Sequence, residues 1–176
     1  MTRRELMRVK ASLGDALKEK GKSQTAFAKE VGYDQSTISK WVTGNRTITK
    51  EAKPILARAV DSFKYYTTLI KETTGIGFAP YMDGKKIKRD VASLRVLVEQ
   101  EQRDTMEFWD KDFWYVPADS ANEREIQEAR RFVQEYSEKL AIEFNLLGAF
   151  CEQYRFSLKE VDQKRDLAFK TRGFVK

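Results

Sequence analysis

The side chains that could do covalent or metal chemistry are scarce in this chain of 176 residues. It contains no histidine, so the usual general base and the commonest metal ligand are both missing. Its one cysteine, Cys151, lies between Phe150 and Glu152 with no cation beside it, which favours buried packing over a reactive thiol. The carboxylates of Asp110 and Asp112 stand in a charged stretch without metal-ligand companions. We therefore expect no enzyme activity, no metal site and no cofactor.

A different chemistry is offered by a run of short polar side chains. The spacing predicts a helix from Gln35 to Val42 with Ile38 and Trp41 among its inward residues, and Trp41 is interpreted as core rather than as a contact. The outward residues are Gln35, Ser36, Thr37, Ser39 and Lys40. Hydroxyls, an amide and one cation suit base edges and phosphate oxygens, whereas a solvated helix more often carries Glu–Lys pairs. Ordinary solvated side chains are the alternative explanation of this surface.

The window around this helix has further fixed spacings. Its residues fit the pattern Q-x-x-x-A-x-x-x-G-x-x-x-S-x-[IV]-S-x-x-x-x-G-x-R with Gln24, Ala28, Gly32, Ser36, Ile38, Ser39, Gly44 and Arg46. Residues 12–60, roughly a third of the chain, thereby resemble the Cro/CI (Xre) family of phage and bacterial regulators. The resemblance implies a lambda-repressor-like domain with a helix-turn-helix that binds DNA.

The same resemblance implies roles for individual residues. Gln24 would pack over Gln35, eleven residues later, and the pair would read an adenine and a phosphate. The other expected DNA contacts are Ser36, Thr37, Ser39 and Lys40 on the recognition helix and Thr43, Asn45 and Arg46 after it. Of these, we expect Gln35, Ser36 and Lys40 to read sequence.

Short helices must position these side chains. Apolar residues three or four apart, Leu6 and Val9 among them, predict a first helix over residues 2–20. Ser23 is expected to cap the second helix, which ends at Gly32, where the corner favours a positive φ. Its inward residues would be Phe27, Ala28 and Val31. Asp34 is expected to cap the recognition helix.

Net charge separates this segment from the rest of the chain. Residues 1–62 hold 13 Lys and Arg against 7 Asp and Glu, a net +6, while residues 63–176 hold 20 of each. The whole basic excess therefore lies where the helix-turn-helix pattern lies, as expected for a segment that binds a polyanion.

The remaining two thirds of the chain also show helical periodicity. The absence of Gly and Pro after residue 57 predicts that the last helix of the DNA-binding domain continues unbroken to Thr74. Residues 75–84 carry dense turn signals and are interpreted as a hinge that folds apolar side chains back. A helix is predicted from Val91 to about Lys111 after an Asp90 cap, and a last helix starts at the capping box of residues 157–160.

The longest apolar pattern predicts a helix of about thirty residues. Its members are Ile126, Ala129, Val133, Tyr136, Leu140, Leu147, Phe150 and Tyr154, interrupted by Glu143. Such a helix is too long to be buried by its own small domain. We expect it to pack antiparallel on the helix over 91–111 and also on a copy of itself.

An aromatic cluster precedes that helix, made of Phe108, Trp109, Phe113, Trp114 and Tyr115. Large rings of this kind either plug the turn of a helical hairpin or line a pocket for a ligand or partner. We favour the plug.

Together these patterns predict an all-α protein with three parts. Residues 1–62 would form the helix-turn-helix domain, 63–84 a helical connector and loop, and 85–176 a long-helix hairpin or bundle for dimerisation or regulation. We expect a cytoplasmic, sequence-specific regulator of phage or mobile-element type, most readily a repressor, that binds a palindromic site on double-stranded DNA as a homodimer or higher oligomer. The sequence contains no run of eighteen apolar residues, so we expect no membrane span. The alternatives are an antitoxin or antirepressor with a protein partner on the C-terminal helices, and a phage DNA-organising protein.

Overall fold

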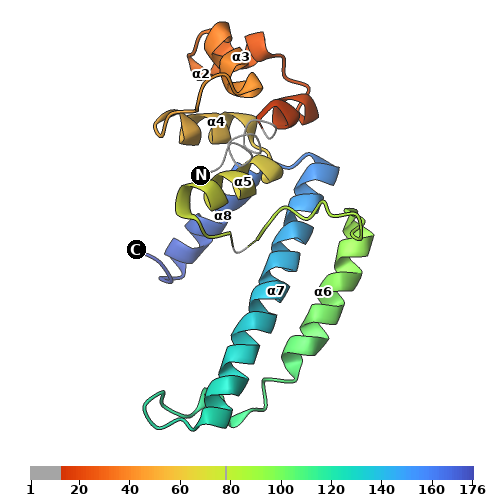
Figure 1. Ribbon diagram of the computed structural model, residues 1–176, viewed down its shortest axis with the longest axis vertical. Helices are drawn as coiled ribbons and strands as arrows, with labels where there is room; N and C mark the ends of the chain where they lie inside the picture. Colours follow the sequence, from red (N-terminus) through yellow and green to blue (C-terminus); the bar gives the residue numbers. More distant parts are fainter. Residues whose placement is uncertain (1–12, 78) are drawn as a thin grey trace. The chain divides into compact units, whose positions relative to one another are not determined.

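The structure is a computed structural model that describes residues 13–77 and 79–176 (Figure 1). These residues form helices and no β-strand, which confirms the all-α class. Leu6 and Val9 of the predicted first helix lie outside the described residues. In the part of the chain that is described, no helix combines the length and the apolar character needed to cross a bilayer.

The chain divides into two compact units, which group α5 and α8 with the helix-turn-helix. The first unit comprises residues 13–77 together with 155–176, and the second comprises residues 79–154. In the first unit, a helical segment at residues 13–19 is followed by α2 (Gln24–Val31), α3 (Gln35–Thr43), α4 (Ala52–Val60) and α5 (Phe63–Thr74), and the end of the chain adds α8 (Leu158–Thr171).

One continuous apolar core holds the first unit together. Its largest buried side chains are Leu13, Leu17, Phe27, Ile38, Trp41, Leu56, Val60 and Tyr65. They come from five consecutive helices, so each helix contributes to the same cluster, and each such side chain stabilises the unit by about 1.5–3 kcal/mol relative to exposure. The predicted inward residues Phe27 and Ala28 are buried, and Val31 packs partly buried against them.

The turn between α4 and α5 shows that the predicted unbroken helix is wrong. Asp61 adopts the left-handed conformation with φ +47°, and the hydroxyl of Ser62 then accepts the backbone N–H of Tyr65 to begin α5. Aspartate enters this region more readily than most residues, so neither Gly nor Pro was needed to break the helix. The Asp61 carboxylate also accepts the backbone N–H of Lys159 at 3.2 Å, which joins the start of α8 to this turn.

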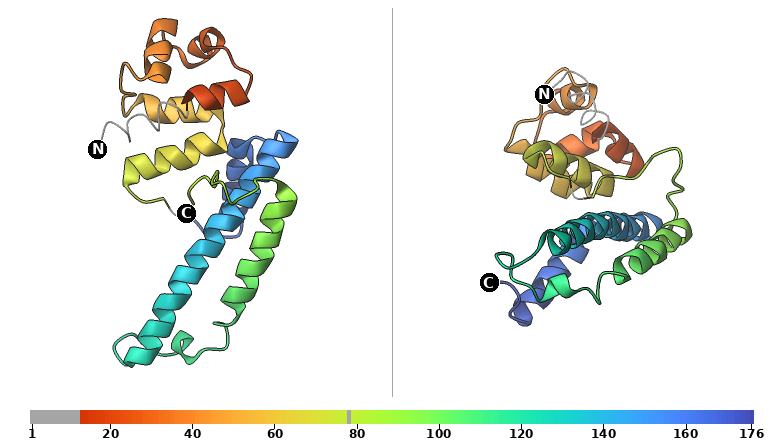
Figure 2. Two further views of the ribbon diagram at one scale, coloured as in Figure 1. Left: turned by 45° about the vertical axis from the view of Figure 1, so that its right-hand side comes forward. Right: turned by 60° about the horizontal axis from the view of Figure 1, so that its bottom comes forward.

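In the second unit two long helices run antiparallel and side by side, as predicted (Figures 1 and 2). They are α6 (Val91–Met106) and α7 (Glu123–Tyr154), with the short 3-10 helix η1 (Asp112–Trp114) between them. Asp90 caps α6 as expected, since its side chain accepts the backbone N–H of Ser93 at 2.9 Å. The helix ends at Met106, about one turn before the predicted Lys111, because residues 107–110 form turns that turn the chain toward α7.

Aromatic rings fill the turn end of this hairpin, where the chain passes from α6 to α7. The ring of Trp114 stacks on Trp109 and meets the ring of Phe132 on α7 edge-on, with centroids 5.2 and 4.7 Å away. The Trp114 indole N–H donates to the carbonyl oxygen of Phe108 at 2.7 Å. Rings that fill the space between two helix ends in this way favour the plug over a ligand pocket.

The loop before α6 is held by a polar clamp, which we define as Arg89, Asn145 and Glu152. The Arg89 guanidinium donates to both carboxylate oxygens of Glu152, at 3.1 and 3.2 Å, and to the Asn145 side-chain oxygen at 2.7 Å. It also stacks 3.9 Å from the centroid of the Tyr81 ring. These contacts hold the loop on α7, and the expected folding back of apolar side chains stays a prediction.

Asn145 is the centre of the clamp and is fully buried. Its side-chain N–H groups donate to the carbonyl oxygens of Pro80 and Ala141, each at 2.8 Å, while its oxygen accepts the backbone N–H of Met82 at 3.1 Å. Every hydrogen-bonding group of this amide is thus used, which is the condition for a buried polar residue to be stable.

Candidate nucleic-acid interface

Both ends of α2, which lead into and out of the turn before α3, are built as the sequence predicted. The Ser23 hydroxyl accepts the backbone N–H of Ala26 at 3.1 Å and so caps α2. At the other end Gly32 has φ +73°, and the next N–H, from Tyr33, donates to the carbonyl oxygen of Ala28 at 3.0 Å. This left-handed corner favours glycine, because a Cβ is disfavoured at positive φ.

Packing beneath α3 fixes which of its faces points outward. Ile38 and Trp41 are buried, and the ring of Tyr33 meets the Trp41 ring edge-on at 5.0 Å. The Trp41 indole N–H is itself buried and has no hydrogen-bond partner among the described residues. Trp41 is therefore core and not a DNA contact. The support from Tyr33 was not anticipated, because an aromatic residue in a turn carries no periodic signal.

Asp34 occupies the N-cap position of α3, but its carboxylate makes no capping hydrogen bond. The first turn is closed instead by its carbonyl oxygen, which accepts the N–H groups of Thr37 and Ile38 at 2.9 and 3.1 Å. The expected side-chain cap is thus wrong, and the backbone conformation of Asp34 sets the start of the helix.

The predicted contact residues all retain solvent access. Those that are exposed are Gln35, Ser36, Lys40, Thr43, Asn45 and Arg46, and those that are half-buried are Gln24, Thr37 and Ser39. On α3 the spacing of three and four residues places Ser36, Lys40 and Thr43 on one face, away from Ile38.

Two of these residues are held by hydrogen bonds within the free protein. The Thr43 hydroxyl donates to the carbonyl oxygen of Ser39 at 2.8 Å, so it must rotate before it can donate to a phosphate. The backbone N–H of Arg46 donates to the carbonyl oxygen of Lys40 at 3.1 Å, which fixes the chain after α3 while the Arg46 side chain stays exposed.

The pair of glutamines is not joined by a hydrogen bond in this state. Gln24 opens α2 and Gln35 opens α3, as the resemblance requires. Within the described residues, no hydrogen bond links their side chains, so both amides are available to turn toward a ligand.

One basic residue near this surface has a structural role instead. The Lys22 ammonium donates to both carboxylate oxygens of Glu30, at 2.7 and 2.8 Å, and to the carbonyl oxygen of Ala59 at 2.9 Å. It therefore ties α2 to the end of α4. We exclude Lys22 from the candidate contacts for this reason.

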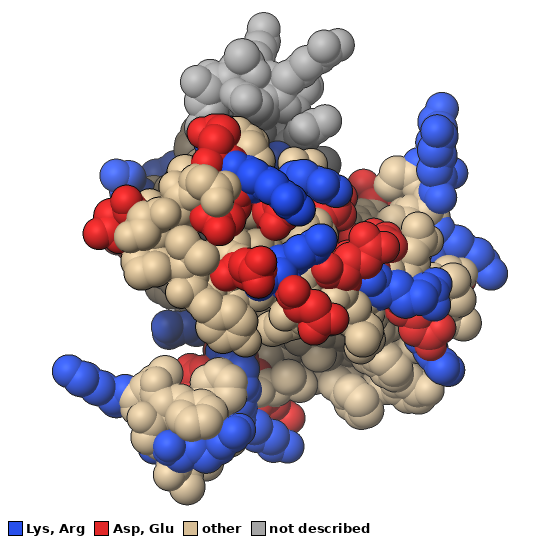
Figure 3. Space-filling model, turned by 90° about the horizontal axis from the view of Figure 1, so that it is seen from below, with Lys and Arg blue, Asp and Glu red and all other residues tan. Residues whose placement is uncertain are grey.

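The division into units sharpens the charge contrast seen in the sequence. Residues 1–77 and 155–176 together carry 22 Lys and Arg against 11 Asp and Glu, a net +11, whereas residues 78–154 carry 11 against 16, a net −5. On the broadest part of the face shown in Figure 3, acidic and basic side chains are interspersed. The unit that contains the helix-turn-helix is thus the one that attracts a polyanion.

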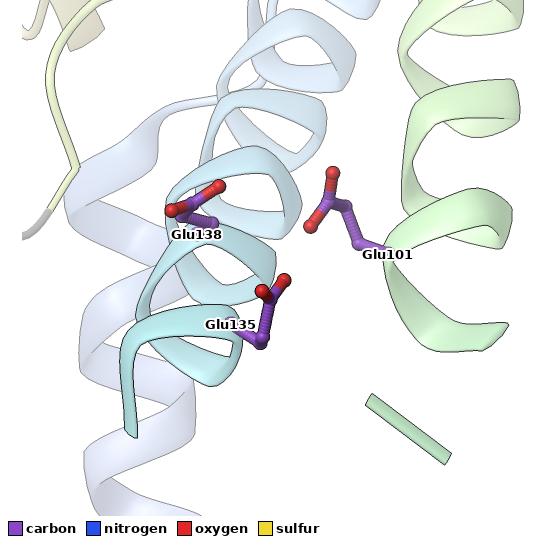
Figure 4. Close-up of side chains that lie close together, drawn as sticks. All are labelled: Glu101, Glu135 and Glu138. Atoms are coloured by element: carbon purple, nitrogen blue, oxygen red, sulfur yellow. The ribbon is translucent and has the colours of Figure 1, made fainter. Parts of the chain in front are cut away.

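A cluster of three carboxylates lies in the second unit. Glu101 of α6 and Glu135 and Glu138 of α7 point toward one another, with their oxygens within 4.8 Å (Figure 4). Burial first, and then the charges of Asp104, Glu138 and Glu135, raise the pKa of Glu101 above its ordinary value. Acidic clusters are common without an ion, so this geometry alone assigns no metal.

The fold and this surface define a DNA-binding domain of the transcription-regulator type: a helix-turn-helix whose second helix points amides, hydroxyls and a cation outward from an apolar base. Residues 13–59 match the family model described as Helix-turn-helix, which supports the Cro/CI type inferred from the motif. The match covers 47 of the 176 residues and so assigns this segment rather than the whole chain. No curated protein and no solved structure matches the chain.

Proposed function

We propose that this protein is a sequence-specific transcriptional regulator, acting as a repressor, that binds a palindromic operator on double-stranded DNA as a dimer. The observation that carries the proposal is the outward polar face of α3, positioned by a helix-turn-helix on the unit with net charge +11. Repression follows from occupying an operator that overlaps a promoter. The protein would act in the cytoplasm of a bacterial cell or phage-infected host, from a gene carried by a phage or mobile element.

Sequence would be read by α3 lying in the major groove. Gln35, Ser36 and Lys40 are exposed on the helix and offer donors and acceptors to base edges. Asn45 and Arg46 follow the helix and suit the phosphates beside the groove. Since phosphate contacts supply most of the affinity, binding should weaken steeply as salt rises.

We expect a palindromic DNA site because two copies of the protein related by a two-fold axis would bind inverted half-sites. Two α3 helices related by that axis must reach two half-sites one duplex turn apart, about 34 Å. A site selected from random DNA should then contain inverted half-sites with that spacing, and direct repeats or a single half-site would contradict the dimer.

The main experiment is selection from a random DNA library with the purified full chain, followed by binding measurements with Gln35→Ala. One lost bidentate base contact costs about 1–3 kcal/mol, so we expect operator binding to weaken about 5- to 150-fold while binding to random DNA changes less than about twofold. Gln163→Ala, an exposed glutamine on α8 of the same unit, is the matched control and should bind both DNAs normally. Equal losses on operator and random DNA would contradict the assignment of α3.

An interaction protein of antitoxin or antirepressor type is the second candidate, favoured by the apolar side chains that α7 leaves exposed. In that case the first unit would bind DNA to regulate its own gene while α7 holds a different protein. Copurification of a second chain in stoichiometric amount would support it. A DNA-organising role would instead be indicated if an operator-linked reporter gene did not respond to the protein.

A further inference from the structure

A row of apolar side chains lies exposed along the whole length of α7. Its members are Ile126 (39% exposed), Val133 (64%), Leu140 (44%), Leu147 (37%) and Tyr154 (53%). They follow one another at intervals of seven residues, and we call them the heptad stripe. Contiguous apolar surface on a helix that is otherwise packed marks an interaction site rather than chance exposure.

The heptad stripe lies on the side of α7 that faces away from α6 and from the polar clamp. At 100° per residue, Glu135, Asn145 and Ala149 stand roughly 140–220° around the helix from Leu140. Glu135 lies beside Glu101 of α6, Asn145 binds the loop before α6, and Ala149 is buried. Those three residues therefore face away from the stripe, whereas Cys151, 5% exposed, stands about 20° from Leu140 and is already covered.

Seven-residue spacing points to another helix as the occupant. A straight α-helix drifts by about 20° per heptad, so a strict heptad pattern stays in register only with a helix that supercoils around it. The stripe runs over 28 residues, or about 42 Å. Tyr136 and Phe150 add apolar contacts at the intermediate positions such a pairing uses.

Charge and area fit a second copy of the same helix. Beside the stripe lie charged residues of both signs, Glu125, Arg130 and Lys139, so two copies do not meet as surfaces of one like charge. The one acidic residue that interrupts the pattern, Glu143, already has the Lys139 ammonium 3.7 Å from its carboxylate. If each stripe residue and Phe150 exposes roughly 100 Å², two copies bury about 1,200 Å², the lower end of specific interfaces.

We propose that the heptad stripe of α7 is the surface on which a second copy of this chain docks, helix against helix across a two-fold axis. In such a pairing the same patch serves both partners, as a symmetric dimer requires. The inference names the interface of the proposed dimeric regulator and rests on that function, but self-association can be measured without DNA.

The test compares two valines of nearly equal exposure, one on each helix of the hairpin. Val133 belongs to the stripe, whereas Val96, 61% exposed, lies on α6. The full-length protein is measured by sedimentation velocity over a range of concentrations without DNA. We expect the parent and Val96→Lys to be dimers, Val133→Lys to raise the dimer dissociation constant at least about tenfold, and the double variant Val133→Lys/Leu140→Lys at least about a hundredfold. Circular dichroism and melting of each variant verify that the helices remain folded.

Two results would contradict this interface. The parent could be monomeric up to about 100 µM, or Val133→Lys could have the same dimer dissociation constant as Val96→Lys. A complex in which a different protein occupies the stripe, detected by its mass, overturns it as well. Val133→Lys should bind DNA with a single half-site as tightly as the parent does. Unlike the parent, it should bind the full palindrome no more tightly than the half-site. If no DNA sequence is selected while Val133→Lys still yields monomers, the proposed function fails and the interface stands.

Discussion

The two units of this chain hold their helices together by different means. In the first unit, side chains such as Leu13, Phe27 and Leu56 fill one apolar core to which five helices contribute. In the second unit the loop before α6 is fixed by Arg89 and Asn145, while α7 leaves a row of apolar side chains in solvent. The first unit buries these apolar side chains in its own core. The second unit leaves apolar side chains of α7 exposed, where a partner could cover them.

This difference fits the tasks proposed for the units. A surface that reads DNA needs side chains held at fixed positions, and a close-packed core provides that rigidity. A helix that assembles with another must keep its apolar face uncovered, so its own fold depends more on directed hydrogen bonds. A fully satisfied polar network can supply that geometry without covering the face.

The largest expected effect breaks the core of the first unit. Leu56 is fully buried, and Leu56→Ala should lower the free energy of unfolding of this unit by about 3 kcal/mol through lost burial and the cavity left behind. The neighbouring Ile55 is 44% exposed, so Ile55→Ala should cost less than about 1 kcal/mol. Urea unfolding followed by circular dichroism measures both, and similar losses for the two variants would show that α4 does not pack as described.

Breaking the polar clamp should lower the free energy of unfolding by a smaller amount. Asn145→Leu keeps the branched shape of the side chain but leaves the Pro80 carbonyl, the Met82 N–H and one Arg89 donor without their partner, which should cost about 2 kcal/mol in the second unit. Gln153→Leu, at an exposed site on the same helix, should change the unfolding midpoint little. A neutral Asn145→Leu would mean that apolar packing alone holds the loop, and the contrast between the units would disappear.

The smallest effect is a pH dependence that sharpens the picture of the second unit. The pKa of Glu101 is raised in the folded state, so its ionised form is disfavoured there and the unit loses stability as pH rises through that pKa. Glu101→Gln should therefore be more stable than the parent at pH 7, and the difference should shrink as the pH falls below the ordinary glutamate pKa of about 4.3. Melting temperatures at a series of pH values measure it. Glu107→Gln, exposed on the turn after α6, is the control for the loss of one negative charge.

The elements that follow local rules are predictable from the sequence. Ser23 and Gly32 mark the ends of α2 because capping and positive φ each demand few residue types. Periodicity likewise located the buried residues of α3. The roles of the outward residues on α3 stay predictions, since a free protein shows their exposure and not their ligand.

Features that depend on distant residues could not be predicted. Asn145 reads as a polar interruption of an apolar helix, and its partner Arg89 lies 56 residues away. The turn at Asp61 carries no Gly or Pro, and one of its carboxylate's partners is 98 residues further on. Periodicity also found the apolar residues of α7 but could not tell which face was already occupied by α6.

The placement of the apolar core also has a consequence for how the protein is made. Every buried residue of that core, from Leu13 to Tyr65, is synthesised before α7, and α8, which follows α7 in the chain, adds no buried residue. On a ribosome, the helix-turn-helix can therefore fold before α7 has been translated. The proposed DNA-reading surface would then exist on nascent chains that are still single, and the proposed pairing through α7 would come only after that helix has been synthesised.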